Sequence, residues 1–137
     1  MTKSAGKPQE KGVTGPAPVV NEPGKVRNVV VVGHSGVGKT TLVEALLAAT
    51  GTIDRAGTIT DGTTTCDTDP AAVKQQRSVT LSCAPILYAG IKINLLDTPG
   101  YADFVGELRA GLRPAAAAVY DVTAVDGRDA ATQTLWA

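Results

Sequence analysis

Aromatic residues are scarce in this 137-residue chain, at 4%, and so are cysteines, of which there are two. With so few aromatic side chains, the core must be aliphatic and rich in alanine. Cys66 and Cys83 lack the spacing of a metal site, so we expect free thiols in a reducing compartment. Net charge is also absent, because 13 basic residues balance 13 acidic ones. The chain therefore has no electrostatic footprint for general nucleic-acid binding, and we expect no DNA partner.

Long hydrophobic runs are missing as well. No apolar segment is long enough to span a membrane, and the N-terminus lacks the apolar stretch of a signal peptide. We therefore expect a cytoplasmic protein with no membrane partner. The length suits one ordinary domain, and a composition of 43% hydrophobic and 19% charged residues is typical of a soluble globular protein.

The most informative motif is G-H-S-G-V-G-K-T, which occupies residues 33–40. It follows the apolar run 29–32 and opens a helical pattern, as a phosphate-binding loop (P-loop) does; the plainer alternative is a glycine-rich turn. Its glycines let backbone N–H groups point at a phosphate, and the helix start adds unpaired N–H groups. We expect Lys39 to reach the terminal phosphates and the Thr40 hydroxyl to hold Mg2+. The predicted nucleotide-binding residues here are His34, Ser35, Gly36, Val37, Gly38, Lys39, Thr40 and Thr41.

The rest of the chain divides into a leader and one domain. Residues 1–25 are rich in lysine, glycine and proline, and we expect them to be disordered. The domain, residues 26–137, has strand and helix patterns in alternation, which predicts an α/β fold with helices covering a mostly parallel sheet. The expected elements are a strand over 26–32, a helix over 38–49, a polar connection over 52–76, an antiparallel hairpin of strands 79–88 and 91–96, a helix over 101–112, a strand over 115–122 and a helix from 129.

Two further signals follow the polar connection. D-T-P-G at 97–100 comes directly after a predicted strand, where Asp97 can orient Mg2+ and Gly100 can bring a backbone N–H to the terminal phosphate. Alone, this motif also reads as an ordinary turn. In R-S-V-T at 77–80, Thr80 could contact Mg2+ and the γ-phosphate. The residues alone do not separate that role from a threonine in a β-strand.

Together these segments resemble the N-terminal part of the GTPase domain of translational GTPases, above all elongation factor G and its divergent second type. The resemblance covers about residue 27 to the end and rests on Gly33-His34 and on four later segments: G-T-T-T-C-D at 62–67, D-T-P-G-Y-A-D-F at 97–104, Asp126-Gly127 and Q-T-L-W at 133–136. It implies a P-loop NTPase G domain, a three-layer sandwich that binds GTP or GDP with Mg2+. It also implies GTP hydrolysis coupled to the ribosome, whose rRNA and proteins are then partners. We expect a monomer.

The same resemblance assigns roles to residues. It makes Lys39 and Thr40 contacts to phosphate and magnesium, and it makes Thr80, Asp97 and Gly100 contacts of the two switch segments. The residues expected near the metal are Thr40, Thr80 and Asp97. Two positions depart from the family pattern, because Gly36 replaces a usual aspartate and Ser78 replaces a usual glycine.

The guanine-reading N-K-x-D segment and the later S-A motif are absent from the chain. Guanine specificity is therefore implied by the resemblance alone. We expect a G domain truncated before its guanine-specificity strands, as a piece of a longer multidomain factor. Three alternatives stay open: a GTP-binding ribosome-associated regulator or protection factor with little hydrolysis, an ATP-using P-loop protein, and an inert truncated fragment.

Tyr101 stands where the family has the histidine that positions or polarises the attacking water, so with Lys39 it is the candidate catalytic residue. Tyrosine has an ordinary pKa of about 10 and is a donor at neutral pH, so we predict slow hydrolysis. Tyr101→His should raise the single-turnover rate of GTP hydrolysis by the full-length protein. An unchanged rate would show that Tyr101 is wrongly assigned.

Overall fold

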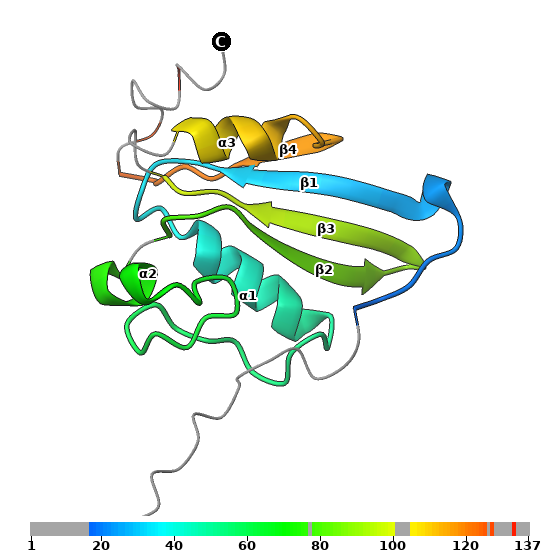
Figure 1. Ribbon diagram of the computed structural model, residues 1–137, viewed down its shortest axis with the longest axis horizontal. Helices are drawn as coiled ribbons and strands as arrows, with labels where there is room; N and C mark the ends of the chain where they lie inside the picture. Colours follow the sequence, from blue (N-terminus) through cyan, green and yellow to red (C-terminus); the bar gives the residue numbers. More distant parts are fainter. Residues whose placement is uncertain (1–16, 77, 101–104, 126, 128–132, 134–137) are drawn as a thin grey trace, which may run out of the picture.

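The computed structural model describes residues 17–137 except 77, 101–104, 126, 128–132 and 134–137. Four strands form one sheet in the order β2-β3-β1-β4 (Figure 1). Their bounds are β1 Val26–Val32, β2 Ser82–Tyr88, β3 Ile91–Asp97 and β4 Ala117–Tyr120. The central strand β1 pairs in parallel with β3 and β4, whereas β2 and β3 form an antiparallel hairpin. The mostly parallel sheet with one hairpin is confirmed.

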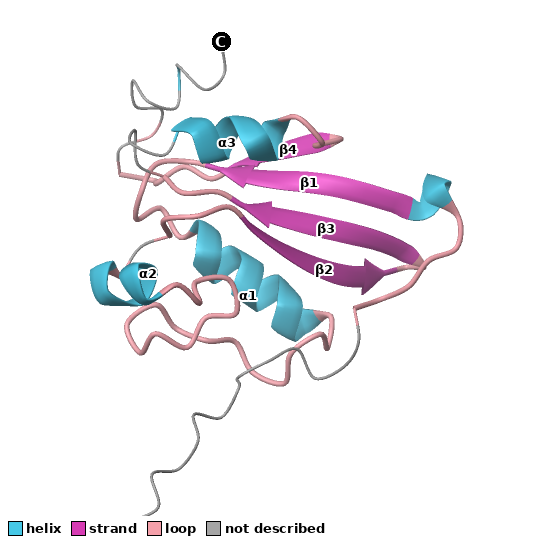
Figure 2. Cartoon of the chain, viewed as in Figure 1, coloured by secondary structure: helices cyan, strands magenta, loops and turns pink. Residues whose placement is uncertain are grey.

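Helices cover both faces of this sheet (Figure 2). The helices are η1 Pro23–Lys25, α1 Lys39–Ala49, α2 Pro70–Gln75 and α3 Val105–Leu112. Alternate side chains of β1 enter two separate apolar layers, because successive residues of a strand point to opposite faces. Val31 packs with Val43 and Leu47 of α1, while Val30 packs with Leu108 of α3. The expected three-layer α/β sandwich is confirmed.

Several predicted boundaries were wrong. The polar connection 52–76 contains a short helix, α2, which Asp69 caps by accepting from Ala71 N at 2.7 Å ahead of Pro70. The strand expected from 79 begins at Ser82, because Leu81 N donates to Glu107 Oε2 at 3.0 Å and not to the sheet. The strand expected over 115–122 is four residues long.

Other expectations fall partly or wholly outside the described residues. These are the first 16 residues of the leader, residues 101–104 of a predicted helix, and the helix from 129 apart from Gln133. Residues 17–25 lie within the described part, and η1 leads directly into β1. None of the described helices is long and apolar enough to cross a membrane.

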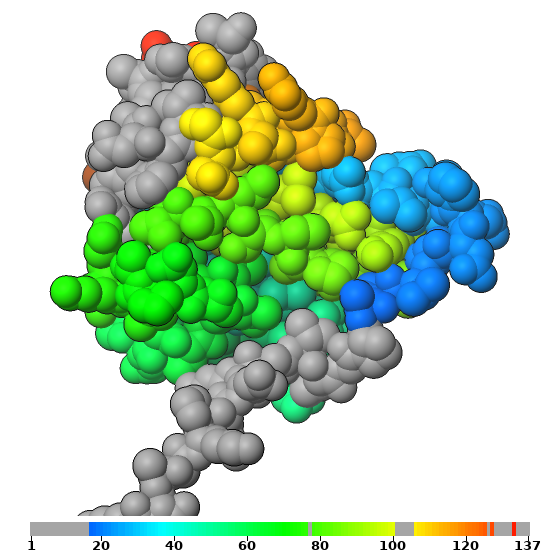
Figure 3. Space-filling model, in the orientation of Figure 1, coloured from blue at the N-terminus to red at the C-terminus, as the bar shows by residue number. Residues whose placement is uncertain are grey.

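A buried carboxylate of α1 holds the segment between α1 and α2 against the rest of the domain. Glu44 of α1 is 1% exposed, and it accepts hydrogen bonds from Gly57 N, at 2.8 Å, and from Thr65 N. Farther along, Ser82 Oγ donates to the carbonyl of Cys66 at 2.7 Å. The segment therefore packs against the body of the domain (Figure 3). Cys66 is buried and Cys83 is exposed, and both are free thiols.

Candidate functional site

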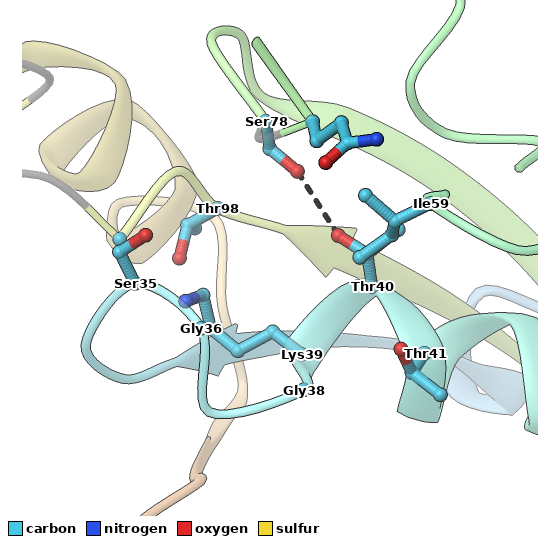
Figure 4. A pocket seen from close by; sticks show the side chains of 11 residues that line it. Ser35, Gly36, Gly38, Lys39, Thr40, Thr41, Ile59, Ser78 and Thr98 are labelled. Atoms are coloured by element: carbon cyan, nitrogen blue, oxygen red, sulfur yellow. Dashed lines mark hydrogen bonds between the residues drawn. The ribbon is translucent and has the colours of Figure 1, made fainter. Parts of the chain in front are cut away.

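A pocket of about 260 Å³ opens where the P-loop joins β1 to α1 (Figure 4). The carboxyl ends of the parallel strands β1 and β3 meet at this edge, where ligands bind in open α/β sheets. Its walls come from the P-loop, from the segments on either side of α2, and from the D-T-P-G segment. The lining residues are Ser35, Gly36, Gly38, Lys39, Thr40, Thr41, Ile59, Gln76, Ser78, Thr98 and Gly100.

The backbone of the P-loop suits an anion. Gly36 and Gly38 have φ angles of +83° and +108°, a region in which side-chain-bearing residues are strained. Gly38 caps α1 without any side-chain hydrogen bond. The N–H groups of the first helical turn therefore have no side-chain cap and are available to a phosphate.

Lys39 is the cationic group of the pocket. It is 6% exposed, and its Nζ donates to the carbonyl of His34 at 2.8 Å. Burial lowers the pKa of Lys39, and the charges of Asp97 and Asp121 oppose that change. A buried ammonium group that donates to a backbone carbonyl can exchange this partner for a phosphate oxygen.

Asp97 and Thr40 form the candidate magnesium-binding pair. Thr40 Oγ1 donates to Asp97 Oδ2 at 2.7 Å, and Asp97 Oδ1 is buried without a hydrogen-bond partner. Burial raises the pKa of Asp97 to about 6, although the Thr40 hydrogen bond opposes the rise. The hydroxyl is a hard ligand of the kind that Mg2+ prefers, and the free carboxylate oxygen can orient the ion through its bound water, so these residues fit the ion. Among the described residues no cluster of three His, Cys, Asp or Glu side chains could hold a metal, so water and phosphate would complete the coordination.

The D-T-P-G segment lies directly against the P-loop. Thr98 Oγ1 donates to the carbonyl of Val31 at 2.6 Å, which fixes the segment to β1. A Cβ atom on Gly100 would lie 2.5 Å from Ser35 N and 2.6 Å from Lys39 Nζ. Only glycine allows this approach, so the position requires the residue that the motif contains.

The structure brings together most of the predicted site residues, although their roles stay predictions. Those that line the pocket are Ser35, Gly36, Gly38, Lys39, Thr40, Thr41 and Gly100. Asp97 is not a lining residue, but it accepts a hydrogen bond from Thr40. His34 and Val37 belong to the loop but not to the lining, and His34 is exposed. Thr80 is exposed and outside the lining, so its expected contact with Mg2+ requires a rearrangement of its segment. Tyr101 lies outside the described residues.

Four lining residues were not predicted as site residues: Ile59, Gln76, Ser78 and Thr98. Ile59 and Gln76 come from the polar connection, where no motif marked them. Ser78 was visible only as a departure from the usual glycine. Thr98 lies inside the D-T-P-G motif, whose spacing could have indicated it.

Gly100→Ala should lower the free energy of unfolding by about 1–3 kcal/mol, because the new methyl group overlaps backbone and Lys39 atoms. Gly106→Ala is the matched control, since a Cβ atom there meets nothing within 4 Å and lies on α3. The control should keep its stability or gain up to about 1 kcal/mol. Urea unfolding of both variants measures the difference. Equal effects would contradict the close approach of Gly100 to the P-loop.

The raised pKa of Asp97 predicts a pH dependence for the metal-free protein. The folded state binds this proton more tightly than the unfolded chain, so stability should fall as pH rises from about 4 to about 6. At pH 7 this lowers the free energy of unfolding by about 2–3 kcal/mol relative to pH 4. Asp97→Asn should remove that share of the slope, measured by urea unfolding in a chelator. An identical slope in the variant would contradict the assignment.

Comparisons with known proteins agree with this geometry. Residues 24–137 match the family model described as the elongation factor Tu GTP binding domain. An elongation factor G-like protein of Mycobacterium tuberculosis is 60% identical over 120 residues, 88% of this chain and 17% of that protein. An oxytetracycline resistance protein of Streptomyces rimosus is 39% identical over 79% of this chain and 16% of its own length. A crystal structure of a Thermus thermophilus protein matches with a TM-score of 0.79 and 46% identity, covering 82% of this chain and 17% of that one.

The chain thus spans about 17% of the length of the Mycobacterium tuberculosis and Thermus thermophilus proteins. Within that span, the family model covers the sheet, the P-loop and the D-T-P-G segment together. The chain therefore belongs to the elongation factor Tu GTP-binding domain family of translational GTPases, with elongation factor G-like proteins among its relatives.

Proposed function

We propose that this chain forms the phosphate- and magnesium-binding part of a G domain that binds GTP and GDP. The observation that carries the proposal is the convergence of Lys39, Thr40 and Gly100 on one pocket at the start of α1. Each of the three residues belongs to a motif for which the sequence predicts a contact with phosphate or with its magnesium ion. Their approach within one pocket supports a common ligand.

In this proposal, different residues of the pocket bind the phosphates and the magnesium ion. The P-loop amides and Lys39 hold the phosphates, and the N–H of Gly100 faces the terminal one. Thr40 and Asp97 hold Mg2+, and Thr80 joins them in the triphosphate state. The bound ion neutralises phosphate charge, and positioning with charge stabilisation is the chemistry that GTP hydrolysis requires.

In the longer protein, we propose that slow GTP hydrolysis is coupled to action on the ribosome. Relatives named elongation factor G-like protein and elongation factor G 2 support this assignment. We further propose a cytoplasmic, monomeric protein whose guanine specificity is supplied outside this phosphate-binding part.

A second candidate is a GTP-binding regulator or protection factor that scarcely hydrolyses its nucleotide. It is favoured by Tyr101 in place of histidine and by the similarity to the oxytetracycline resistance protein. Multiple-turnover assays of the full-length protein with and without ribosomes separate the two. Turnover stimulated by ribosomes supports the first candidate, and GTP-dependent ribosome binding without turnover supports the second.

The proposal predicts saturable binding of fluorescent GTP by this 137-residue chain in Mg2+. Lys39→Ala should weaken that binding by about 10-fold or more, because a charge-assisted hydrogen bond to phosphate is lost. Lys25→Ala is the matched control: it removes the same charge from η1, at the opposite end of β1 from the P-loop. Its affinity should equal that of the wild type.

Competition between nucleotides completes the test. Displacement by GTP but not ATP would support guanine preference in this chain. Equal displacement by both would support a phosphate cradle whose base pocket lies elsewhere in the protein. No saturable binding, or equal losses in both lysine variants, would overturn the proposal for this chain and leave the inert fragment.

A further inference from the structure

Ser78 lies beside the Thr40 hydroxyl, which we propose as a magnesium ligand. No sequence motif predicts this position for Ser78. It lines the pocket in the segment that leads to Thr80, and its Oγ lies 3.0 Å from Thr40 Oγ1 (Figure 4). Thr80, the residue expected at the metal, is exposed and does not line the pocket. In this arrangement Ser78, and not Thr80, faces Thr40.

The proton count of these hydroxyl groups makes Ser78 the donor in its hydrogen bond with Thr40. Each hydroxyl carries one proton. Thr40 donates its proton to Asp97 Oδ2 at 2.7 Å. The hydrogen of the 3.0 Å contact between Thr40 and Ser78 is therefore the one that Ser78 carries. Ser78 Oγ then keeps both of its lone pairs, and Thr40 Oγ1 keeps one. Because both residues line the pocket, a cation there can be bound by both oxygens once the hydroxyl hydrogen of Ser78 turns away from Thr40.

The spacing also suits one ion. Two adjacent ligands of an octahedral Mg2+ ion, each about 2.1 Å from the metal, lie about 3.0 Å apart. The two hydroxyl oxygens have this separation. Behind them, Asp67 Oδ2 and Asp97 Oδ1 are buried without hydrogen-bond partners. These carboxylate oxygens can accept hydrogen bonds from water bound to the ion, as outer-shell groups do.

We propose that Ser78 is a second hydroxyl ligand, beside Thr40, for the magnesium ion of the nucleotide site. This inference rests on the proposed function and adds a residue to it. A glycine, the usual residue at this position in the family, has no side chain to offer the ion. Ser78 thus gives the ion a ligand from the segment that leads to Thr80, in the arrangement that leaves Thr80 exposed.

The test uses Mn2+ as a paramagnetic substitute for Mg2+ and measures its affinity for the chain with GDP bound, by electron paramagnetic resonance. Ser78→Ala should weaken Mn2+ binding by about 10-fold. Ser82→Ala is the matched control, because it removes a nearby hydroxyl, at the start of β2, whose proton goes to the carbonyl of Cys66. Its affinity for Mn2+ should equal that of the wild type. Thermal unfolding followed by circular dichroism verifies that each variant is folded.

A second variant tests the ligand directly and does not depend on Ser78→Ala folding well. Ser78→Cys places a soft thiolate at the same point, so it should lower Mn2+ affinity and raise Cd2+ affinity relative to the wild type. Ser82→Cys controls for thiols elsewhere, including Cys66 and Cys83. Gain of Cd2+ affinity at 78 and not at 82 supports coordination by the side chain.

The outcomes separate this inference from the proposed function. If the wild type binds GDP but Ser78→Ala keeps or increases its Mn2+ affinity, Ser78 is not a ligand and the inference alone is overturned. Increased affinity would mark the Thr40–Ser78 contact as one that the ion must break. If the wild type does not bind GDP, the proposed function falls and the inference falls with it.

Discussion

The buried hydrogen bond between Thr40 and Asp97 is the contact on which the site depends. It joins the first turn of α1 to the end of β3, across segments that lie 57 residues apart in the sequence. Parallel pairing of β1 with β3, which sets Val31 beside Asp97, brings both ends to one edge of the sheet. The apolar layers on the two faces of the sheet exclude water from this junction, so the free oxygen of Asp97 has no bulk solvent to satisfy it.

A different kind of contact holds the segments around the pocket. Glu44 fixes the connection after α1 through two backbone N–H groups, and Ser78 meets Thr40 through one hydroxyl contact. Few apolar side chains of the connection are buried in the core; among the described residues they are Ile53, Cys66 and Ala72. Elements held by a few polar contacts open at a smaller free-energy cost than packed strands do. The α/β sandwich is therefore the rigid part of the site. The segments that the family resemblance assigns to switches surround the pocket and are held less firmly.

The fold could be predicted from the sequence because its signals are local. Continuous apolar runs, the turn at Gly90 and the strand-loop-helix order indicated the sheet, the hairpin and the position of the P-loop. The pocket was predictable where a motif supplied the residue, as at Lys39, Thr40 and Gly100. Ile59 and Gln76 were not, because their approach depends on how a long connection folds back over α1. Ser78 could be recognised in the sequence only as a departure from the usual glycine, because its place beside the Thr40 hydroxyl depends on the fold of the whole segment.

We propose above all that the P-loop edge of this chain binds phosphate. Nuclear magnetic resonance of the 14.0 kDa chain can test it amide by amide during a titration with GDP and Mg2+. We predict that the largest chemical-shift changes fall on the amides of Gly36, Gly38, Lys39 and Gly100. The amide of Gly90, at the hairpin turn between β2 and β3, should not change. Changes centred away from the P-loop, or none at saturating GDP, would contradict the account.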